Sequence, residues 1–330
     1  MVPTDPQSAA HLLQTPAHTV ALIVGDVMLD EYVSGSVDRV SPEAPVPVLR
    51  ERERSTRPGG AANVATGTRA LGARTELVGV VGRDPAGDLL GRALVDAGVD
   101  PGGLVVDDAR PTTTKTRIVA RHQQMLRIDR EVDTAIGGAV RREVRERALA
   151  RLSAAHVLVL QDYDKGVLDA LLVGELIAAA SARGVPSVVD PKLRLFFSYA
   201  GATVFKPNAA EVAAALGLET FDPEGRQLRD LADRTGCRHL LVTLGERGAC
   251  LFETTTAELV RIPSVAREVY DVTGAGDATT AALAVCLARG ATVRDAAEIA
   301  NVAAGVAVGR LGARPVPADE ILAALRHDHH

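Results

Sequence analysis

The stretch at 271–277 reads DVTGAGD, so two carboxylates flank a turn that has almost no side chains. The sequence that follows, ATTAALAVCLARG, is an almost uninterrupted helical pattern that ends at Gly290. Gly274, Ala275 and Gly276 would therefore lie at a helix N-terminus, where free main-chain N–H groups and the helix dipole favour an anion. Because glycines let an anion approach the main chain closely, the turn indicates a phosphate site.

Asp277 would lie at the edge of that site, where a carboxylate repels phosphate unless it has a task. In phosphoryl transfer, such a carboxylate orients the acceptor hydroxyl and takes its proton, while positioning and charge neutralisation supply most of the catalysis. The alternative is a plain tight turn in which Asp277 caps the helix. We favour the catalytic interpretation.

A second glycine pair opens another helical pattern, RPGGAANVATGTRALGA at 57–73. Gly59 and Gly60 would allow close main-chain approach to a polar ligand, and Asn63 offers a donor and an acceptor to hydroxyl groups. A Gly-Gly pair before a helix is also common in ordinary loops, so this motif is weak evidence by itself.

The segment KPNAAE places Asn208 and Glu211 three residues apart at a helix start. This spacing describes a capping box, and it also suits a Glu211 that holds the water shell of Mg²⁺. Gly245 and Gly248 in VTLGERG suit either a nucleotide edge or a hairpin. Neither a Walker motif nor a Rossmann glycine fingerprint follows the first strand pattern, which disfavours a P-loop kinase or a nicotinamide enzyme.

The elements that must position these motifs are short apolar runs that alternate with Ala- and Leu-rich helical patterns. We expect strands at 21–30, 77–82, 157–162, 187–190, 203–208 and 239–245. The alternation predicts an α/β fold with a doubly wound, mostly parallel sheet flanked by helices, and a ligand site at the strand C-termini. Polar residues gather at those ends, namely Asp26, Asp162, Asp190, Asn208 and Thr243.

Two stretches interrupt the pattern, at 31–55 and 112–131. Their β-branched, alternating character predicts antiparallel strands, which we interpret as a small β-sheet lid inserted into one α/β body at 19–318. We expect residues 1–18 to be flexible, and residues 319–330 to form the end of a helix and a flexible tail. Edge strands of the lid could pair between two chains, which predicts a homodimer.

Composition narrows the class of function. The 330 residues carry a formal net charge of -5, which provides no electrostatic reason to expect a nucleic-acid partner. No apolar run reaches the length of a membrane span. Three widely spaced cysteines, Cys237, Cys250 and Cys286, are typical of reduced core thiols. We therefore expect a cytoplasmic protein that acts on a small molecule.

With PGGAANVA, KPNAAE and DVTGAGD in this order, the chain resembles the PfkB (ribokinase-like) family of sugar kinases over about residues 19–318. The segments SPEAPVPV, HQQMLRID and DYDKG are most similar to its heptose 7-phosphate kinase branch. The resemblance implies Mg²⁺ATP-dependent transfer to O1 of D-glycero-β-D-manno-heptose 7-phosphate, in ADP-heptose synthesis. No H-x-G-H nucleotidyltransferase motif occurs, so adenylylation is expected from another protein.

The resemblance also implies roles for individual residues. Asp277 becomes the catalytic base, and the amides of Gly274, Ala275 and Gly276 become the anion hole. The nucleotide and its metal are expected at Asn208, Glu211 (Mg²⁺, through water), Thr243, Gly245, Gly248 and Asn301. The sugar is expected at Asp26, Gly59, Gly60 and Asn63. Asp271 and the Thr273 carbonyl would help to hold a monovalent cation such as K⁺.

A bisphosphate product requires cations for the second phosphate, because a dianion held away from the catalytic centre needs its own partners. The candidates for this clamp are Lys115, Arg117, Arg121, Lys165 and Lys192. The alternative is that several of them are surface charges of the lid.

Two other functions stay open. The first is a PfkB kinase for fructose 1-phosphate, tagatose 6-phosphate or a nucleoside, and the second is a sugar-binding sensor without catalysis. The SPEAPVP and HQQMLRID segments argue against the first, and the intact GAGD turn argues against the second. The segment LGARP at 311–315 departs from the Leu-Gly-Thr of heptose kinases, which leaves the nucleotide side less firmly assigned.

Overall fold

The centre of the molecule is a nine-stranded sheet, seen in a computed structural model that describes residues 6–14, 18–121, 123–223, 227–266, 269–310 and 312–327. In spatial order its strands are β13 (Leu259–Ile262), β12 (Ala249–Glu253), β11 (His239–Thr243), β10 (Val204–Phe205), β9 (Ser187–Asp190), β8 (Val157–Gln161), β1 (Val20–Gly25), β4 (Arg74–Gly82) and β5 (Leu104–Asp107). Neighbours are parallel except for β11, β12 and β13, which pair antiparallel. The predicted doubly wound, mostly parallel sheet is confirmed.

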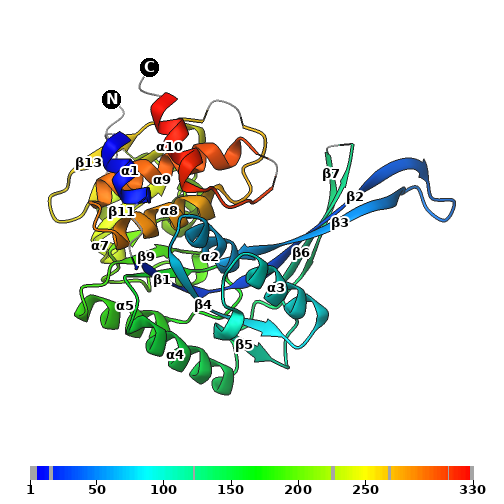
Figure 1. Cartoon of the computed structure of the whole chain (residues 1–330), viewed down its shortest axis with the longest axis horizontal. Coiled ribbons are helices and arrows are strands. Elements are labelled where there is room, and N and C mark those ends of the chain that lie inside the picture. The colour runs from blue at the N-terminus through cyan, green and yellow to red at the C-terminus, as the bar shows by residue number, and fades with distance from the viewer. Residues whose placement is uncertain are drawn as a thin grey trace.

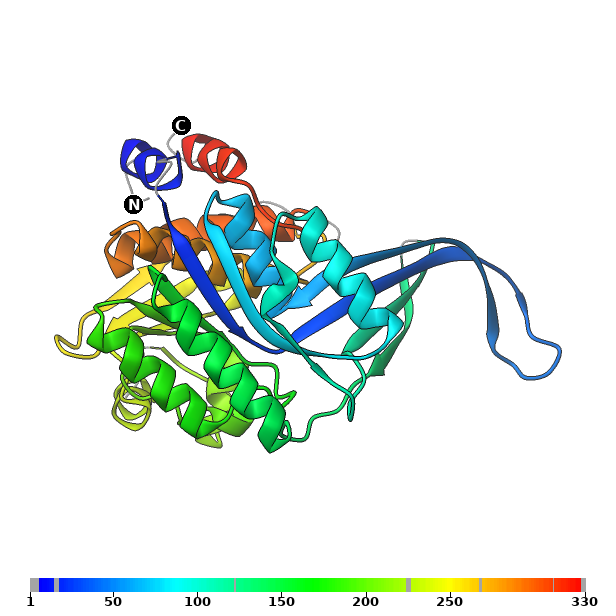
Figure 2. The same cartoon turned by 60° about the horizontal axis from the view of Figure 1, so that its bottom comes forward.

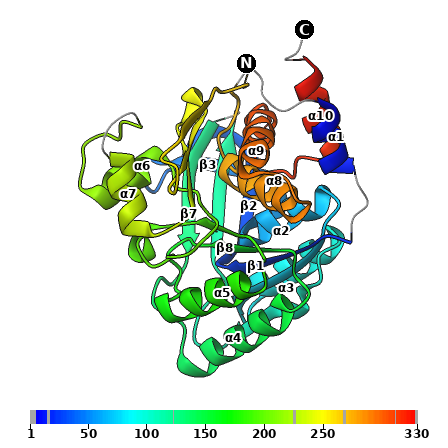
Figure 3. The same ribbon diagram turned by 90° about the vertical axis from the view of Figure 1, so that its left-hand side faces the viewer.

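Helices cover both faces of this sheet (Figures 1 and 3). One face carries α2 (Ala61–Ala70), α3 (Pro85–Asp96), α8 (Ala275–Ala288) and α9 (Val293–Val308); the other carries α4 (Gly138–Leu152), α5 (Ala170–Ala182), α6 (Ala209–Leu216) and α7 (Gln227–Thr235). Successive residues of a strand point to opposite faces, so Ile23 joins one core and Leu22 and Val24 join the other. Runs that are apolar at every position are therefore required in the central strands.

A separate four-stranded sheet projects from this body (Figures 1 and 2). Its order is β3 (Pro47–Gly60), β2 (Val27–Val40), β6 (Thr114–Ala120) and β7 (Gln123–Arg130). We call this sheet the lid. Both stretches that were expected to form it do so, although β2 and β3 extend beyond 31–55 into the body. Each stretch forms an antiparallel pair, β2 with β3 and β6 with β7, but β2 and β6 pair parallel, so the expectation of antiparallel strands was wrong at the centre of the lid.

The prediction of a single strand at 21–30 was wrong, because two strands, β1 and β2, meet within this range. The chain passes from β1 in the body to β2 in the lid at Asp26, whose N–H donates to the Gln161 carbonyl at 3.1 Å. A Cβ at Gly25 would lie 1.9 Å from the Gln161 carbonyl oxygen, so only glycine allows this close approach. The apolar run continues through the junction, which is why the pattern alone does not reveal it.

The N-terminal end of the chain also differs from expectation. Residues 6–14 of the segment expected to be flexible form helix α1 (Pro6–Gln14), and α10 (Ala318–His327) follows the last strand and helices of the body. Ala9 and Leu13 are buried against the body, and Arg289 donates to the carbonyls of Leu12 and Leu13 at 2.7 and 3.0 Å. These contacts hold α1 in place. Residues 1–5, 15–17 and 328–330 lie outside the described residues.

Cys237, Cys250 and Cys286 are buried and unpaired, as predicted, and burial raises the pKa of each thiol. None of the helices in the described ranges has the length and hydropathy needed to cross a membrane. The lid exposes Leu126 and Ile128, with relative exposures of 57% and 52%. The homodimer stays a prediction.

Candidate active site

Asp277 lies in the first turn of α8 and is buried. Asn63 Nδ2 donates to its Oδ2 at 2.7 Å, while the Tyr163 hydroxyl and Gln161 Nε2 donate to Oδ1 at 2.8 and 3.3 Å. These donors come from α2, from the loop after β8 and from the end of β8. Two segments that are distant in the sequence, α2 and the end of β8 with the loop after it, thus hold one carboxylate.

Burial raises the pKa of Asp277 to about 6, although the hydrogen bonds from Asn63 and Tyr163 lower it. The negative charge of Asp190 raises this pKa further, and the Lys206 ammonium lowers it. The carboxylate is therefore ionised at neutral pH but binds a proton far more readily than an ordinary aspartate. That is the property required of a general base.

The N-terminus of α8 is open on the side of Lys206. Gly274 is the N-cap residue with φ of 83°, and Gly276 is exposed. A Cβ at Gly276 would have Lys206 Nζ as its nearest neighbour, at 3.9 Å. The main-chain N–H groups that begin α8 and a lysine ammonium therefore border the same space, which suits a phosphate, although the Ala275 N–H donates to the Val272 carbonyl at 3.3 Å.

Lys206 is itself buried and pairs with Asp190, at 3.2 Å between Nζ and Oδ2. The same Asp190 oxygen accepts from Gln161 Nε2 at 2.9 Å. Lys206, Asp190 and Gln161 thus form a chain of polar contacts that ends at Asp277. Lys206, Asp190 and Gln161 were not assigned to the site from the sequence. One feature of the sequence could have indicated Lys206, because only four of the 37 basic residues are lysines.

Asp26 is buried at the junction between body and lid. Its carboxylate accepts the main-chain N–H groups of Tyr163, Lys165 and Val167 at 2.8, 3.0 and 3.2 Å. Burial raises its pKa, although these three hydrogen bonds lower it. Asp26 therefore holds the loop that carries Tyr163 and Lys165. Its expected contact with a sugar stays a prediction.

Gly59 and Gly60 end β3 and lead into α2. A Cβ at Gly59 would lie 2.3 Å from Asp30 Oδ2, and a Cβ at Gly60, whose φ is 58°, would lie 2.5 Å from the Asp26 carbonyl oxygen. Close packing of the lid base therefore demands both glycines, whatever they contact in a complex. Asn63 follows three residues after Gly60 and faces Asp277.

Asn208 and Glu211 form the predicted capping box at the start of α6, with both hydrogen bonds at 2.9 Å. The second Glu211 oxygen pairs with Lys192, whose Nζ lies 5.5 Å from the centre of the Tyr163 ring. Lys192 therefore joins Glu211 to the loop that carries Tyr163.

The other expected nucleotide residues lie along the neighbouring edge. Thr243 at the end of β11 forms a β-bridge with Asn208. Gly245 and Gly248, with φ of 63° and 83°, form the turn of the β11–β12 hairpin. Asn301 of α9 donates to the Pro263 carbonyl at 2.8 Å and so holds the loop after β13. Whether they contact a nucleotide stays a prediction.

Of the predicted phosphate clamp, the structure brings together two residues, Lys115 and Lys165. Both pair with Glu131, at 3.1 and 2.8 Å, and Lys115 also pairs with Asp129 at 3.1 Å. Arg121 lies six residues along β6 and its turn, roughly 20 Å away in an extended strand. One phosphate therefore cannot contact both Lys115 and Arg121.

Asp271 joins the loop before α8 to the segment after α9. Its two oxygens accept the main-chain N–H groups of Thr273 and Gly312 at 2.9 and 2.8 Å. Burial raises the pKa of this carboxyl, but those hydrogen bonds outweigh it and the pKa is lowered. Asp271 is thus ionised and structural in this state. Leu311 lies outside the described residues.

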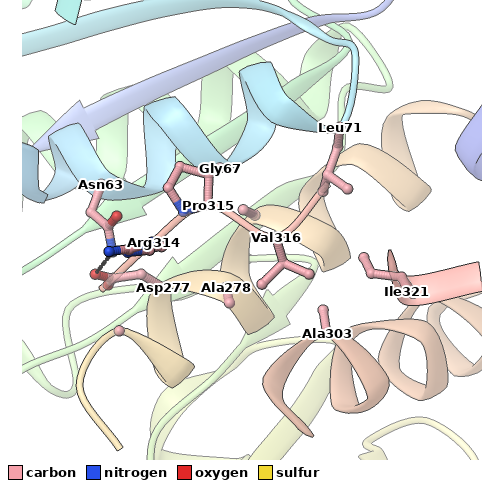
Figure 4. A pocket seen from close by; sticks show the side chains of 12 residues that line it. Asn63, Gly67, Leu71, Asp277, Ala278, Ala303, Arg314, Pro315, Val316 and Ile321 are labelled. Carbon is pink, nitrogen blue, oxygen red and sulfur yellow. Dashed lines mark hydrogen bonds between the residues drawn. The ribbon is translucent and has the colours of Figure 1, made fainter. Parts of the chain in front are cut away.

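A small recess lies behind Asn63 and Asp277 (Figure 4). Its volume of about 10 Å³ has room for about one water molecule, and Arg314, Pro315 and Val316 close it. A sugar cannot enter there.

Residues 20–320 match the family described as pfkB family carbohydrate kinase. The chain belongs to the pfkB family. It is accordingly a phosphotransferase that uses an alcohol group as acceptor. Two solved structures share the fold of this chain. Ribokinase from Arabidopsis thaliana, complexed with ribose and ATP, has a TM-score of 0.72 and 22% identity, and the match covers 94% of this chain and 99% of the ribokinase chain. Phosphofructokinase-2 from Escherichia coli, complexed with potassium, has a TM-score of 0.77 and 19% identity, and the match covers 95% of this chain and 100% of the phosphofructokinase chain.

The curated relatives of this pfkB chain are similar over most of its length. It is 46% identical over 305 residues to bifunctional protein HldE of Azorhizobium caulinodans, and 44% identical over 314 residues to that of Geobacter sulfurreducens. These alignments cover 92% and 94% of this chain but only 64% and 63% of the relatives. The chain thus spans about two thirds of the length of the proteins it matches.

The hydrogen bond from the Tyr163 hydroxyl to Asp277 lowers the pKa of this carboxyl in the pfkB site. Tyr163→Phe removes one donor from ionised Asp277, so we expect its pKa to rise from about 6 by about one unit. Because only ionised Asp277 accepts a proton, the acid limb of kcat/KM should move to higher pH by that amount. The measurement is a pH profile of ADP release.

Tyr199→Phe is the matched control for this profile. Tyr199 also donates to a buried aspartate, Asp162, at the same distance of 2.8 Å, but it does not contact Asp277. Tyr199→Phe should lower the free energy of unfolding by about as much as Tyr163→Phe does, and it should leave the acid limb of kcat/KM at the same pH. An equal shift in both variants would show that the limb does not report Asp277.

Proposed function

We propose that this chain transfers the terminal phosphoryl group of ATP to O1 of D-glycero-β-D-manno-heptose 7-phosphate, which yields the 1,7-bisphosphate used in ADP-heptose synthesis. The observation that carries the reaction is a buried, hydrogen-bonded Asp277 with raised pKa beside the open N-terminus of α8. The sugar is supported by the similarity to HldE proteins, together with the lysine pair on the lid side.

The two oxygens of Asp277 are not equivalent as proton acceptors. Oδ1 already accepts from Tyr163 and Gln161, whereas among the described residues Oδ2 accepts only from Asn63. Because a carboxylate oxygen accepts about two hydrogen bonds, Oδ2 has the free lone pair for the acceptor hydroxyl. The sugar O1 forms a bond to the γ-phosphorus while the bond between the γ-phosphorus and the ADP oxygen breaks. The proton of the sugar hydroxyl passes to Oδ2 of Asp277.

The charge that develops on the transferring group would meet two features of the chain. The Gly274 and Gly276 N–H groups would donate to it at the start of α8, where Lys206 borders the same space. The Ala275 N–H donates to the Val272 carbonyl at 3.3 Å and would have to leave that carbonyl to join the anion hole. Donors that are already in place cost no reorganisation during the reaction. Asn63 and the loop held by Asp26 would orient the sugar.

Mg²⁺ fits the residues on the nucleotide side, although it would have few protein ligands. No group of three acidic, histidine or cysteine ligands occurs among the residues described. Mg²⁺ commonly keeps several waters and binds substrate phosphates with only one or two carboxylates. Glu211, with Asn208 beside it, would hold that water shell. Held there, Mg²⁺ would supply positive charge that neutralises the nucleotide phosphates.

The loop that Asp271 and Thr273 form is the proposed place for a monovalent cation. Asp271 is ionised and joined to Gly312, so a cation beside the Thr273 carbonyl would be held next to the start of α8. K⁺ would then stabilise the anion hole indirectly, through the position of Gly274.

The substrate is tested by ADP release over a panel of acceptors. We expect the highest kcat/KM for the heptose 7-phosphate, with little activity on the unphosphorylated heptose, fructose 1-phosphate, tagatose 6-phosphate or adenosine. A higher value for another acceptor would overturn the substrate but not the kinase. No ADP release with any of them would contradict the proposed reaction.

The 7-phosphate is expected to bind Lys115 and Lys165, which would exchange Glu131 for the ligand. Lys165→Glu should raise the KM for the sugar phosphate by about 10–100-fold and leave the KM for ATP nearly unchanged, because a charge-assisted pair is replaced by a repulsive one. Steady-state kinetics with each substrate varied will check this. Arg50→Glu, an exposed charge on β3, is the control. An unchanged KM in both Lys115→Glu and Lys165→Glu would exclude the clamp.

A further inference from the structure

One face of the lid carries a cluster of polar residues at its base. Asp30 and Tyr32 lie on β2, and Arg57 lies directly opposite Asp30 on β3. Arg117 lies opposite Tyr32 on β6. Residues opposite each other share a face of a sheet, as do residues two apart in a strand. The two guanidinium carbons lie 5.2 and 5.3 Å from the centre of the Tyr32 ring.

The two arginines of this cluster differ in their partners. Arg117 donates to Asp30 at 2.5 Å, and both side chains are nearly buried. Arg57 has a buried Nη1 with no hydrogen-bond partner, and the Tyr32 hydroxyl is also buried without one. Asp271 is the next carboxylate, but its oxygens accept main-chain N–H groups. Within the described ranges, Arg57 thus has no carboxylate partner.

Burying a cation whose N–H groups have no hydrogen-bond acceptor costs free energy, unless a ligand accepts those hydrogen bonds. Arg57 is partly exposed as a residue, which leaves a side from which a ligand can approach. The ligand must be an anion, because guanidinium and hydroxyl groups both offer donors. Phosphate matches a guanidinium better than other common anions do, since its oxygens accept two parallel N–H bonds.

The cluster lies close to the start of α8, because both pack on the segment that contains Gly312 and Ala313. A Cβ at Gly312 would lie 2.6 Å from Arg57 Nη1 and 3.3 Å from the Tyr32 oxygen, so the main chain of Gly312 packs on both. The next residue, Ala313, packs on Gly274 in the same way, at 2.7 Å from a Cβ built there. Arg57 and the N-cap of α8 thus pack on adjacent residues of the same segment.

We propose that Arg57, supported by Tyr32, binds the terminal phosphate of the nucleotide from the lid side, opposite Lys206. This inference rests on the proposed kinase reaction, in which that phosphate lies at the N-terminus of α8. Arg57 would then supply positive charge to the transferring group, and Arg117, already neutralised by Asp30, would hold the Tyr32 ring in place.

The test compares ATP with ADP, because ADP lacks the terminal phosphate. We expect Arg57→Gln to weaken ATP binding in the presence of Mg²⁺ by about tenfold, as for loss of one charge-assisted contact, with ADP binding unchanged. Isothermal titration calorimetry on the full chain gives both dissociation constants without turnover. Arg57→Lys should recover part of the loss, and Tyr32→Phe should show a smaller loss for ATP only.

Arg54→Gln is the matched control, because Arg54 lies three residues away on the opposite face of β3 and pairs with Glu31 and Glu51. It should leave both constants unchanged. Equal weakening of ATP and ADP by Arg57→Gln, or no change in either, would overturn the proposal. A rise only in the KM for the sugar phosphate would overturn it too, by assigning Arg57 to the sugar. Failure of the wild type to phosphorylate any sugar would remove the proposed function but would still leave the ATP and ADP constants to judge Arg57.

Discussion

Asp277→Asn is expected to lower kcat by about 10²–10⁴-fold, the range that a positioned general base contributes. The amide keeps the shape of the side chain but cannot accept the hydroxyl proton at Oδ2. ATP affinity should be nearly unchanged, because the anion hole and Lys206 remain. Single-turnover phosphoryl transfer measured together with ATP binding will separate the two effects.

Stability distinguishes this loss from misfolding. The folded pKa of Asp277, about 6, lies above its ordinary value of 3.8 because of burial, so ionisation of this carboxyl opposes folding at pH above 6. Asp277→Asn should therefore be at least as stable as the wild type at pH 8, and its relative advantage should fall as the pH drops through 6 towards 3.8. Asp100→Asn, an exposed remote variant, should retain activity. Substantial kcat in Asp277→Asn would exclude Asp277 as the base.

Gly276→Val is expected to lower kcat by about 10²–10³-fold, the size of effect seen when an oxyanion site is lost. The new side chain would project into the space that Lys206 borders, which is where a phosphate oxygen is expected. The melting temperature should change little, since a Cβ there meets Lys206 Nζ only at 3.9 Å and Gly276 has an ordinary helical position. Kinetics and thermal melts on the same preparation will check both statements.

Gly274→Ala provides the contrast. Its φ of 83° is strained for alanine, and the new Cβ would lie 2.7 Å from the Ala313 Cβ, so this variant should lose both stability and activity. Gly276→Val should lose activity alone. If Gly276→Val stays fully active, the phosphate does not bind at the N-terminus of α8.

Local patterns were sufficient for much of the fold. The apolar runs of β8 and β9 and the helical pattern of α8 are properties of consecutive residues, and burial on both faces of a parallel sheet requires such runs. The capping box of Asn208 and Glu211 could be predicted for the same reason, because its partners lie three residues apart. The junction at Asp26 and the docking of α1 could not, since both depend on contacts with distant segments.

Consecutive residues specify the alternation of strands and helices and the glycine turn that leaves the start of α8 open for an anion, and the motifs among them identify the family. The surroundings of Asp277 depend instead on tertiary contacts. Its contact with Asn63 spans 214 residues of sequence, and its contact with Gln161 spans 116. A hydrogen bond between such distant residues exists only once the chain has folded. Burial, which raises the pKa of this carboxyl, is a property of the packed body, so the base acquires its chemistry there.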